Sequence, residues 1–207
     1  VTAEQTAGRG RLGRRWASSR GNLMTSIIVR PPPGAPLASV AALPLVVGVA
    51  LAQAVRSVGV AAVLKWPNDV GVMTAAGWRK LGGILAESTG GDAPAIVIGI
   101  GLNLAPGVPA DLTDIATSVG DLGVPPAPDH LLTRLLAALE PRLDAFARAG
   151  LASIRAEWTA LMAPLPRLRA GGIEGTPLGL ADDGGLRLRS DAGDEHHVIA
   201  GDVEVVA

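Results

Sequence analysis

The chain has 207 residues, 48% of them hydrophobic, and a formal net charge of −1 at pH 7. This composition excludes extensive disorder, and the near-neutral charge excludes a global attraction to nucleic acid or anionic membrane. The chain contains no cysteine, which excludes disulfides, thiolate catalysis and cysteine-ligated metals. Its histidines, His130, His196 and His197, offer little basis for a histidine zinc site or a Ser-His-Asp triad.

The N-terminal part of the chain alternates loop, strand and helix. Residues 3–5 look like the end of a strand, and the glycine-rich, basic residues 6–21 lack periodicity, which predicts a loop. The apolar, β-branched residues 23–29 predict a strand. Apolar residues at three- and four-residue steps predict a helix over residues 40–58, with Pro44 in its first turns, where proline is best tolerated.

The uncharged residues 31–55 are long enough to cross a bilayer. They contain five prolines, however, and their densest apolar part, residues 43–52, is too short to span one. We therefore expect a helix buried against a sheet, and no association with a membrane.

Strands and then helices are predicted over the middle of the chain. The four strands expected from apolar runs cover residues 61–64, 70–73, 81–86 and 96–102. Residues 105–128 are irregular, and an amphipathic helix follows with Asp129 as its N-cap. Residues 151–162 predict one more helix.

The pattern changes after Pro164. Short β-like runs alternate with turns at residues 171–172, 182–185 and 192–194, and Asp-Gly turns between apolar runs are typical of hairpins. The sequence therefore predicts a first domain over residues 1–164 and a separate small β module over residues 165–207.

Lysine is unusually rare in this chain. Of the 18 basic residues, only Lys65 and Lys80 are lysines. An ammonium group is a compact point charge, whereas a guanidinium is a planar fork. Two lysines close in sequence in an arginine-rich chain indicate that the amine is needed there, with chance survival as the alternative.

Residues 5–16 hold four arginines and three glycines, without an acidic residue. Glycines let backbone N–H groups approach a phosphate closely, and arginines supply forked, charged donors. The segment lacks the Gly-Lys-Ser/Thr of a P-loop. We interpret it as a binding loop for a small-molecule phosphate, with a solvated basic loop and a nucleic-acid contact as alternatives.

Three further motifs place polar groups at the ends of predicted strands. They are Lys65-Trp66-Pro67-Asn68-Asp69, Arg79-Lys80-Leu81-Gly82-Gly83-Ile84-Leu85-Ala86-Glu87 and Gly99-Ile100-Gly101-Leu102-Asn103. Each motif alone is also compatible with a structural corner and solvated polar groups. Together they predict a ligand cleft at one edge of a sheet.

The four motifs occur in this order in biotin protein ligases, and the chain resembles that family over nearly its whole length. Residues 114–118 and 200–203 also resemble family segments. The resemblance implies an α+β fold: a mixed β-sheet with helices of the class II synthetase type, then a small C-terminal SH3-like β-barrel. Family members carry a strand and a helix before the basic loop. Because these are missing, we expect an N-terminally truncated ligase of the type without a DNA-binding domain.

The resemblance implies an ATP-dependent ligase with two half-reactions. Biotin and ATP form biotinyl-5′-AMP, and a lysine of a biotin carboxyl carrier domain then attacks this adenylate. The expected substrates are biotin and ATP, with Mg²⁺, and the expected location is the cytoplasm, without a nucleic-acid partner. A lipoate-type ligase, a nucleic-acid-binding module and an inactive ligase fragment remain alternatives.

The resemblance also implies roles for individual residues. The catalytic residues would be Lys80, Arg11 and Asp69, with Asp69 also a candidate ligand for Mg²⁺. Biotin would contact Gln5, Gly8, Arg9, Arg11, Lys80, Gly82, Gly83, Gly99 and Gly101. ATP and the adenylate would contact Arg11, Arg14, Trp16, Asn68, Lys80 and Asn103.

Overall fold

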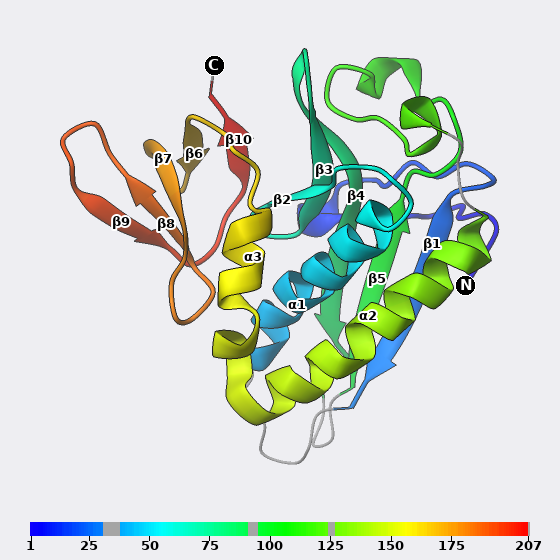
Figure 1. Ribbon diagram of the computed structural model, residues 1–207, viewed down its shortest axis with the longest axis horizontal. Coiled ribbons are helices and arrows are strands. Elements are labelled where there is room, and N and C mark those ends of the chain that lie inside the picture. The colour runs from blue at the N-terminus through cyan, green and yellow to red at the C-terminus, as the bar shows by residue number, and fades with distance from the viewer. Residues whose placement is uncertain (31–37, 91–94, 124–126, 207) are drawn as a thin grey trace.

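A computed structural model describes residues 1–30, 38–90, 95–123 and 127–206 of the chain (Figure 1). Its first sheet has the order β1-β5-β4-β3-β2. These strands are β1 (Leu23–Val29), β2 (Val63–Lys65), β3 (Asp69–Thr74), β4 (Gly77–Ser88) and β5 (Ile96–Leu102). The helices are α1 (Ala38–Arg56), α2 (Pro128–Ala149) and α3 (Arg155–Leu161), with short 3₁₀ turns η1 (Arg11–Gly13), η2 (Ala110–Leu112), η3 (Gly120–Leu122) and η4 (Gly150–Ser153).

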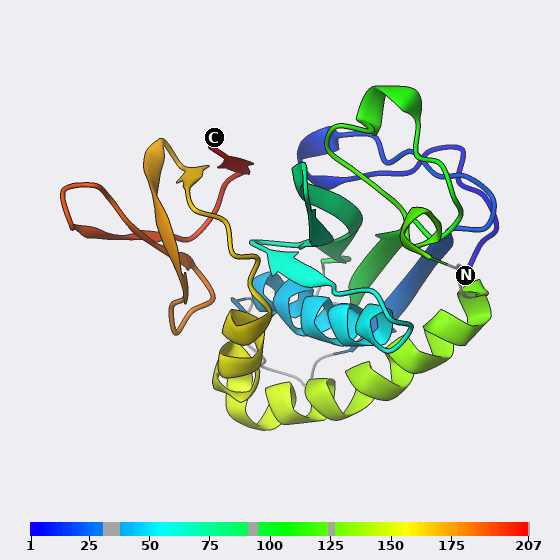
Figure 2. The same cartoon turned by 45° about the horizontal axis from the view of Figure 1, so that its top comes forward.

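Helices α1 and α2 lie on one side of the first sheet, and loops lie on the other (Figure 2). Helix α1 is buried on nearly all sides between the sheet and α2, as its continuous apolar sequence requires. Helix α2 buries only one stripe, Leu131, Leu135 and Leu139. None of the helices among the described residues is long and apolar enough to cross a membrane, and residues 31–37 of the uncharged stretch lie outside that part.

The α+β class is confirmed, while the strand pairing is simpler than the expected mixed sheet. Each ladder of the first sheet is antiparallel in the described residues. Parallel pairing is confined to two isolated bridges, Leu64 with Met162 and Lys80 with Ala116. Successive short connections join β2, β3, β4 and β5, and such connections favour antiparallel neighbours.

The predicted strands at residues 23–29 and 96–102 are confirmed to the residue. Other element boundaries differ from the prediction. Asp129 does not cap α2, because the helix begins at Pro128 with Ala127 at the N-cap. The predicted helix over residues 151–162 is divided into η4 and α3, after a positive φ of 58° at Gly150 ends α2. Pro44 lies inside α1, beyond its first turn.

The C-terminal module is a second sheet with the strand order β10-β6-β7-β8-β9. Its strands are β6 (Leu168–Ala170), β7 (Ile173–Leu180), β8 (Leu186–Arg189), β9 (Glu195–Val198) and β10 (Val203–Val205). This arrangement agrees with the predicted SH3-like module, although no ladder among the described residues joins β9 to β10. The predicted hairpin turns separate β6 from β7, β7 from β8, and β8 from β9.

The turn between β7 and β8 attaches the C-terminal module to the corner between β2 and β3 of the first sheet. The Trp66 indole N–H donates a hydrogen bond to the Gly184 carbonyl at 2.9 Å, and Trp66 is buried. Gly184 has a φ of 90° and lies against Leu45 and Leu151, so a side chain there would meet both apolar residues. The corner at residues 65–69 therefore ends β2 and also provides the contact that attaches the C-terminal module.

Candidate active site

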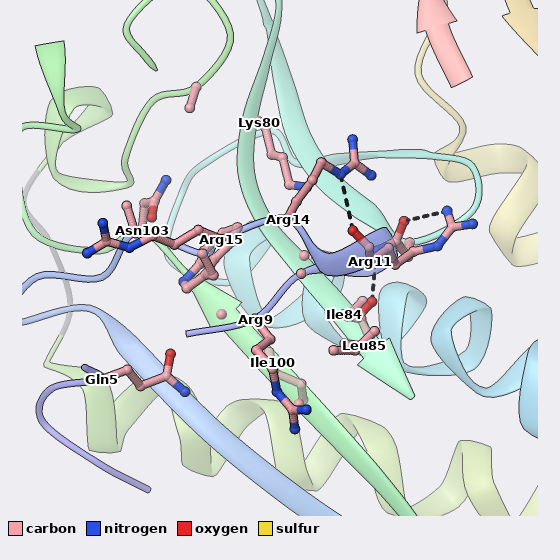
Figure 3. A pocket seen from close by; sticks show the side chains of 18 of the residues that line it. Gln5, Arg9, Arg11, Arg14, Arg15, Lys80, Ile84, Leu85, Ile100 and Asn103 are labelled. Carbon is pink, nitrogen blue, oxygen red and sulfur yellow. Dashed lines mark hydrogen bonds between the residues drawn. The ribbon is translucent and has the colours of Figure 1, made fainter. Parts of the chain in front are cut away.

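A cavity of about 630 Å³ lies over β1, β4 and β5, on the face of the sheet opposite the helices. The basic loop at residues 5–17 and the segment at residues 108–116 form its walls. Figure 3 shows the side chains of the loop and of β4 and β5 meeting around this space. The four motifs found in the sequence therefore contribute to one cavity.

The cavity is strongly cationic. Five basic side chains and a single carboxylate, Glu87, are among its lining residues; the basic ones are Arg9, Arg11, Arg14, Arg15 and Lys80. Arg9 is mostly exposed and lies 3.4 Å from Glu87 at the end of β4. An excess of positive charge facing one concave surface favours an anionic ligand.

Backbone contacts close the basic loop on itself. The Trp16 N–H donates to the Gly8 carbonyl at 2.9 Å, and the Gly10 N–H donates to the Arg14 carbonyl at 2.7 Å. A Cβ at Gly8 would lie 2.5 Å from the Trp16 carbonyl, so glycine is required there for close approach of the two chain segments. Leu12 has a φ of 56° at the tip of the loop.

Besides Arg9, two arginines connect the basic loop to the rest of the protein. Arg11 donates to the Asn68 side-chain oxygen at 3.4 Å and to the Gly201 carbonyl at 3.1 Å. Arg14 lies 2.9 Å from the Asp202 carboxylate. The loop is thus joined both to the corner before β3 and to the segment that leads into β10.

Trp16 lines the cavity and packs against Gly101 of β5. A Cβ at Gly101 would come within 2.6 Å of the Trp16 ring, so this glycine provides the space that the indole occupies. The Lys80 ammonium lies 5.7 Å from the centre of the same ring. This distance allows a favourable cation–π interaction.

Both lysines of the chain contact one carboxylate. Lys80 Nζ lies 2.5 Å from Asp69 Oδ1, and Lys65 Nζ lies 3.2 Å from Asp69 Oδ2. A Cβ at Gly83 would lie 3.2 Å from Lys80 Nζ, so Lys80 reaches Asp69 across this glycine. Burial by itself raises the pKa of Asp69, but the charges of Lys80 and Lys65 outweigh it and hold this pKa below its usual value.

Most of the predicted site residues line the cavity. They are Gln5, Arg9, Arg11, Arg14, Trp16, Asn68, Lys80, Gly83, Gly99, Gly101 and Asn103. Gly8, Gly82 and Asp69 are not among the lining residues. Gly82 instead allows close strand packing, because a Cβ there would lie 2.6 Å from the Gly101 carbonyl. Asp69 contacts Lys80 and does not itself lie on the cavity surface.

Several lining residues did not emerge from the sequence motifs. Thr25 and Ser26 lie on β1, and their polar side chains within an apolar run were a signal that could have found them. In the segment at residues 108–116, only the part from residue 114 onward had a signal, its resemblance to a family segment, and no role followed from it. The segment reaches the cavity through a backbone pairing, in which the Lys80 N–H donates to the Ile115 carbonyl and the Thr117 N–H donates to the Lys80 carbonyl, each at 2.9 Å.

The described residues do not fit a Mg²⁺ site at Asp69. Both carboxylate oxygens face ammonium groups, which occupy the positions that a cation would need. No group of three or more acidic, histidine or cysteine side chains in the described ranges is arranged to hold a metal. We therefore assign Asp69 to holding Lys80 and derive no step through a metal bound there.

Comparison with known proteins agrees with this geometry. The sequence model of the Biotin/lipoate A/B protein ligase family matches residues 1–103, and that of the Biotin protein ligase C terminal domain matches residues 166–206. The chain is 36% identical to the biotin–[acetyl-CoA-carboxylase] ligase of Paracoccus denitrificans, over 93% of this chain and 84% of that protein. It is 38% identical to the bifunctional ligase/repressor BirA of Salmonella typhimurium, over 78% of this chain.

The fold is similar to that of solved ligases as well. The biotin protein ligase of Aquifex aeolicus in complex with biotin and ATP superposes with a TM-score of 0.85 at 27% identity, covering 99% of this chain and 87% of that one. The chain spans about half the length of the BirA relatives of Salmonella typhimurium and Escherichia coli, since 50% of each is covered. Sequence, fold and the shared order of motifs lead to one conclusion: the chain belongs to the biotin protein ligase family.

Proposed function

We propose that the chain is an ATP-dependent biotin ligase that forms biotinyl-5′-AMP and transfers biotin to a lysine of a carboxylase carrier domain. The observation that carries the proposal is the cationic cavity in which Lys80, the basic loop and the glycines of β4 and β5 meet. A solved relative of 27% identity holds biotin and ATP, and a curated relative is named for acetyl-CoA carboxylase as its target.

The first half-reaction joins two anions. A carboxylate oxygen of biotin forms a bond to the α-phosphorus of ATP, and the bond to the β-phosphate oxygen breaks to release pyrophosphate. The two substrates repel each other, so the site must supply positive charge before they meet. Lys80 would stabilise the charge that develops on the α-phosphate, and the arginines of the loop would bind the remaining phosphate oxygens.

In the second half-reaction, the amine nitrogen of the carrier lysine attacks the acyl carbon of biotinyl-5′-AMP. An amide bond forms, AMP leaves, and the amine loses a proton to water. Because the adenylate is a mixed anhydride that hydrolyses readily, the basic loop would have to cover it between the two steps. The contacts of Arg11 and Arg14 with residues 201–202 support a role for the C-terminal module in holding that loop.

The proposed organisation assigns residues 1–164 to substrate binding and catalysis and residues 165–207 to the SH3-like module. Mg²⁺ would enter as part of the MgATP substrate. We propose a cytoplasmic location, where ATP and carboxylase carrier domains are available.

A direct assay tests the function. The purified chain is incubated with radiolabelled biotin, MgATP and a biotin carboxyl carrier domain, and labelled adenylate and labelled carrier are measured separately. Both products are expected, and unlabelled lipoate in excess should leave them unchanged. Suppression by lipoate would favour a lipoate-type ligase, and the absence of both products from the folded chain would overturn the proposal.

Arg9→Ala is expected to release biotinyl-5′-AMP into solution faster than the unmodified chain does. Arg9 lines the cavity and contacts Glu87 at the end of β4, so its loss removes one of the contacts between the loop and the sheet. Free adenylate is measured by filtration of a single-turnover reaction. Arg20→Ala is the matched control, because Arg20 pairs with Glu4 at 3.9 Å, away from the cavity. Equal retention in the two variants would show that Arg9 does not hold the loop closed.

A further inference from the structure

Lys65 is the lysine that the proposed reaction does not use. Its ammonium lies 3.2 Å from Asp69 Oδ2, whereas Lys80 lies 2.5 Å from Asp69 Oδ1, so the two lysines occupy different oxygens of one carboxylate. The Lys65 side chain is 11% exposed and that of Asp69 is 13% exposed. Buried charges are stable only when they are paired, so Lys65 and Asp69 depend on each other.

The cluster of Lys65, Asp69 and Lys80 contains two positive charges and one negative charge. Without Lys65, the carboxylate would face Lys80 alone, and the remaining pair would be neutral. A carboxylate so close to an ammonium cancels much of the field that the ammonium presents to a phosphate. Sharing the carboxylate between two lysines leaves a net positive charge beside the cavity.

The fold holds Lys65 in this position from two directions. Lys65 is the last residue of β2 and lies opposite Asp69 of β3 in the antiparallel ladder. Its ammonium also donates to the Val203 carbonyl at 3.2 Å, at the first residue of β10. The C-terminal module therefore helps to orient the ammonium toward Asp69.

We propose that Lys65 is a positioning residue for adenylate formation, which shares Asp69 with Lys80 and so keeps the Lys80 ammonium available to the anionic substrates. The inference rests on the proposed function, because it concerns the same reaction. Lys65 does not line the cavity, whereas Lys80 does, so Lys65 acts through Asp69 rather than on a substrate.

A double-mutant cycle tests this charge sharing. Biotin-dependent exchange of pyrophosphate into ATP is measured for Lys65→Gln, for Asp69→Asn and for the double variant. Gln keeps a donor for the Val203 carbonyl but removes the charge. Lys65→Gln is expected to lower the exchange rate about tenfold when Asp69 is present, and less than about threefold in the Asp69→Asn background. Lys65→Arg, which keeps the charge, is expected to retain most of the activity.

The control is Arg79→Gln, which removes a positive charge next to Lys80 on β4. Arg79 donates to the carbonyls of Ala76 and Trp78 and has no contact with Asp69. Its effect should be the same in both Asp69 backgrounds. Circular dichroism and thermal unfolding establish that each variant is folded.

Three outcomes of these experiments would contradict the proposed role of Lys65. Equal losses for Lys65→Gln in the two backgrounds overturn the proposal, since the effect would not pass through Asp69. Loss of fold in both Lys65→Gln and Lys65→Met would show a structural role and also overturns it. If the unmodified chain itself shows no biotin-dependent exchange, the proposed function is wrong, and the inference about Lys65, which depends on it, is wrong as well.

Discussion

Lys80→Met is expected to reduce adenylate formation by about 10²–10³-fold, the usual effect of removing one group that stabilises charge in a transition state. Lys80 is the basic residue on the cavity floor, whereas the other basic lining residues belong to the loop. The variant should fold, because Lys80 is partly exposed and Asp69 keeps its contact with Lys65. We therefore expect Lys80→Met to lower the rate of adenylate formation without unfolding the protein.

The measurement is biotin-dependent pyrophosphate exchange under saturating biotin and MgATP. Arg79→Met is the matched control, because Arg79 is the neighbouring basic residue on β4 and does not line the cavity. It should exchange at close to the normal rate. Normal exchange by a folded Lys80→Met would remove Lys80 from the proposed reaction.

Trp66→Ala is expected to lower the free energy of unfolding by about 3–5 kcal/mol, as is typical for truncation of a buried tryptophan. Trp66 is only 4% exposed, and its indole N–H donates to the Gly184 carbonyl at 2.9 Å. The substitution would therefore leave a cavity in the core and an unpaired carbonyl in the turn that docks the C-terminal module.

Trp66→Phe distinguishes these two contributions, because it keeps most of the ring volume and removes the hydrogen bond. Its expected effect is smaller, about 1–3 kcal/mol. Both values come from urea denaturation followed by circular dichroism, with the m-value checked for a single transition. Equal effects of the two variants would show that ring packing contributes little and that the hydrogen bond dominates.

The success of the strand predictions at residues 23–29 and 96–102 has a local cause. These strands are mostly apolar, and each buries several of its residues against the core, so the sequence pattern and the tertiary environment agree. The helix boundaries near Asp129 and residues 151–162 were wrong because local cap signals are weak. The observed ends depend instead on Gly150, on how η4 packs against α1 and α2, and on how α3 packs against α1.

The sequence by itself determined the family, the α+β class and the four motifs that contribute residues to the cavity. It could do so because the basic loop and the three strand-end motifs keep their order and their residue types. The rarity of lysine also indicated that the amine of Lys80 has a specific role. These features are short-range patterns, which a linear sequence displays directly.

The tertiary structure alone decided which charges meet. Asp69 lies between two lysines because β2, β3 and β4 are neighbours in the sheet, and the same contact removes it from the candidate metal ligands. Arg11 and Lys65 reach carbonyls of residues 201–203, which follow them by more than a hundred positions. Such contacts depend on how distant segments of the chain pack. The strength of the electrostatic interactions between these groups depends on their burial, so no local pattern in the sequence can predict the contacts or their strength.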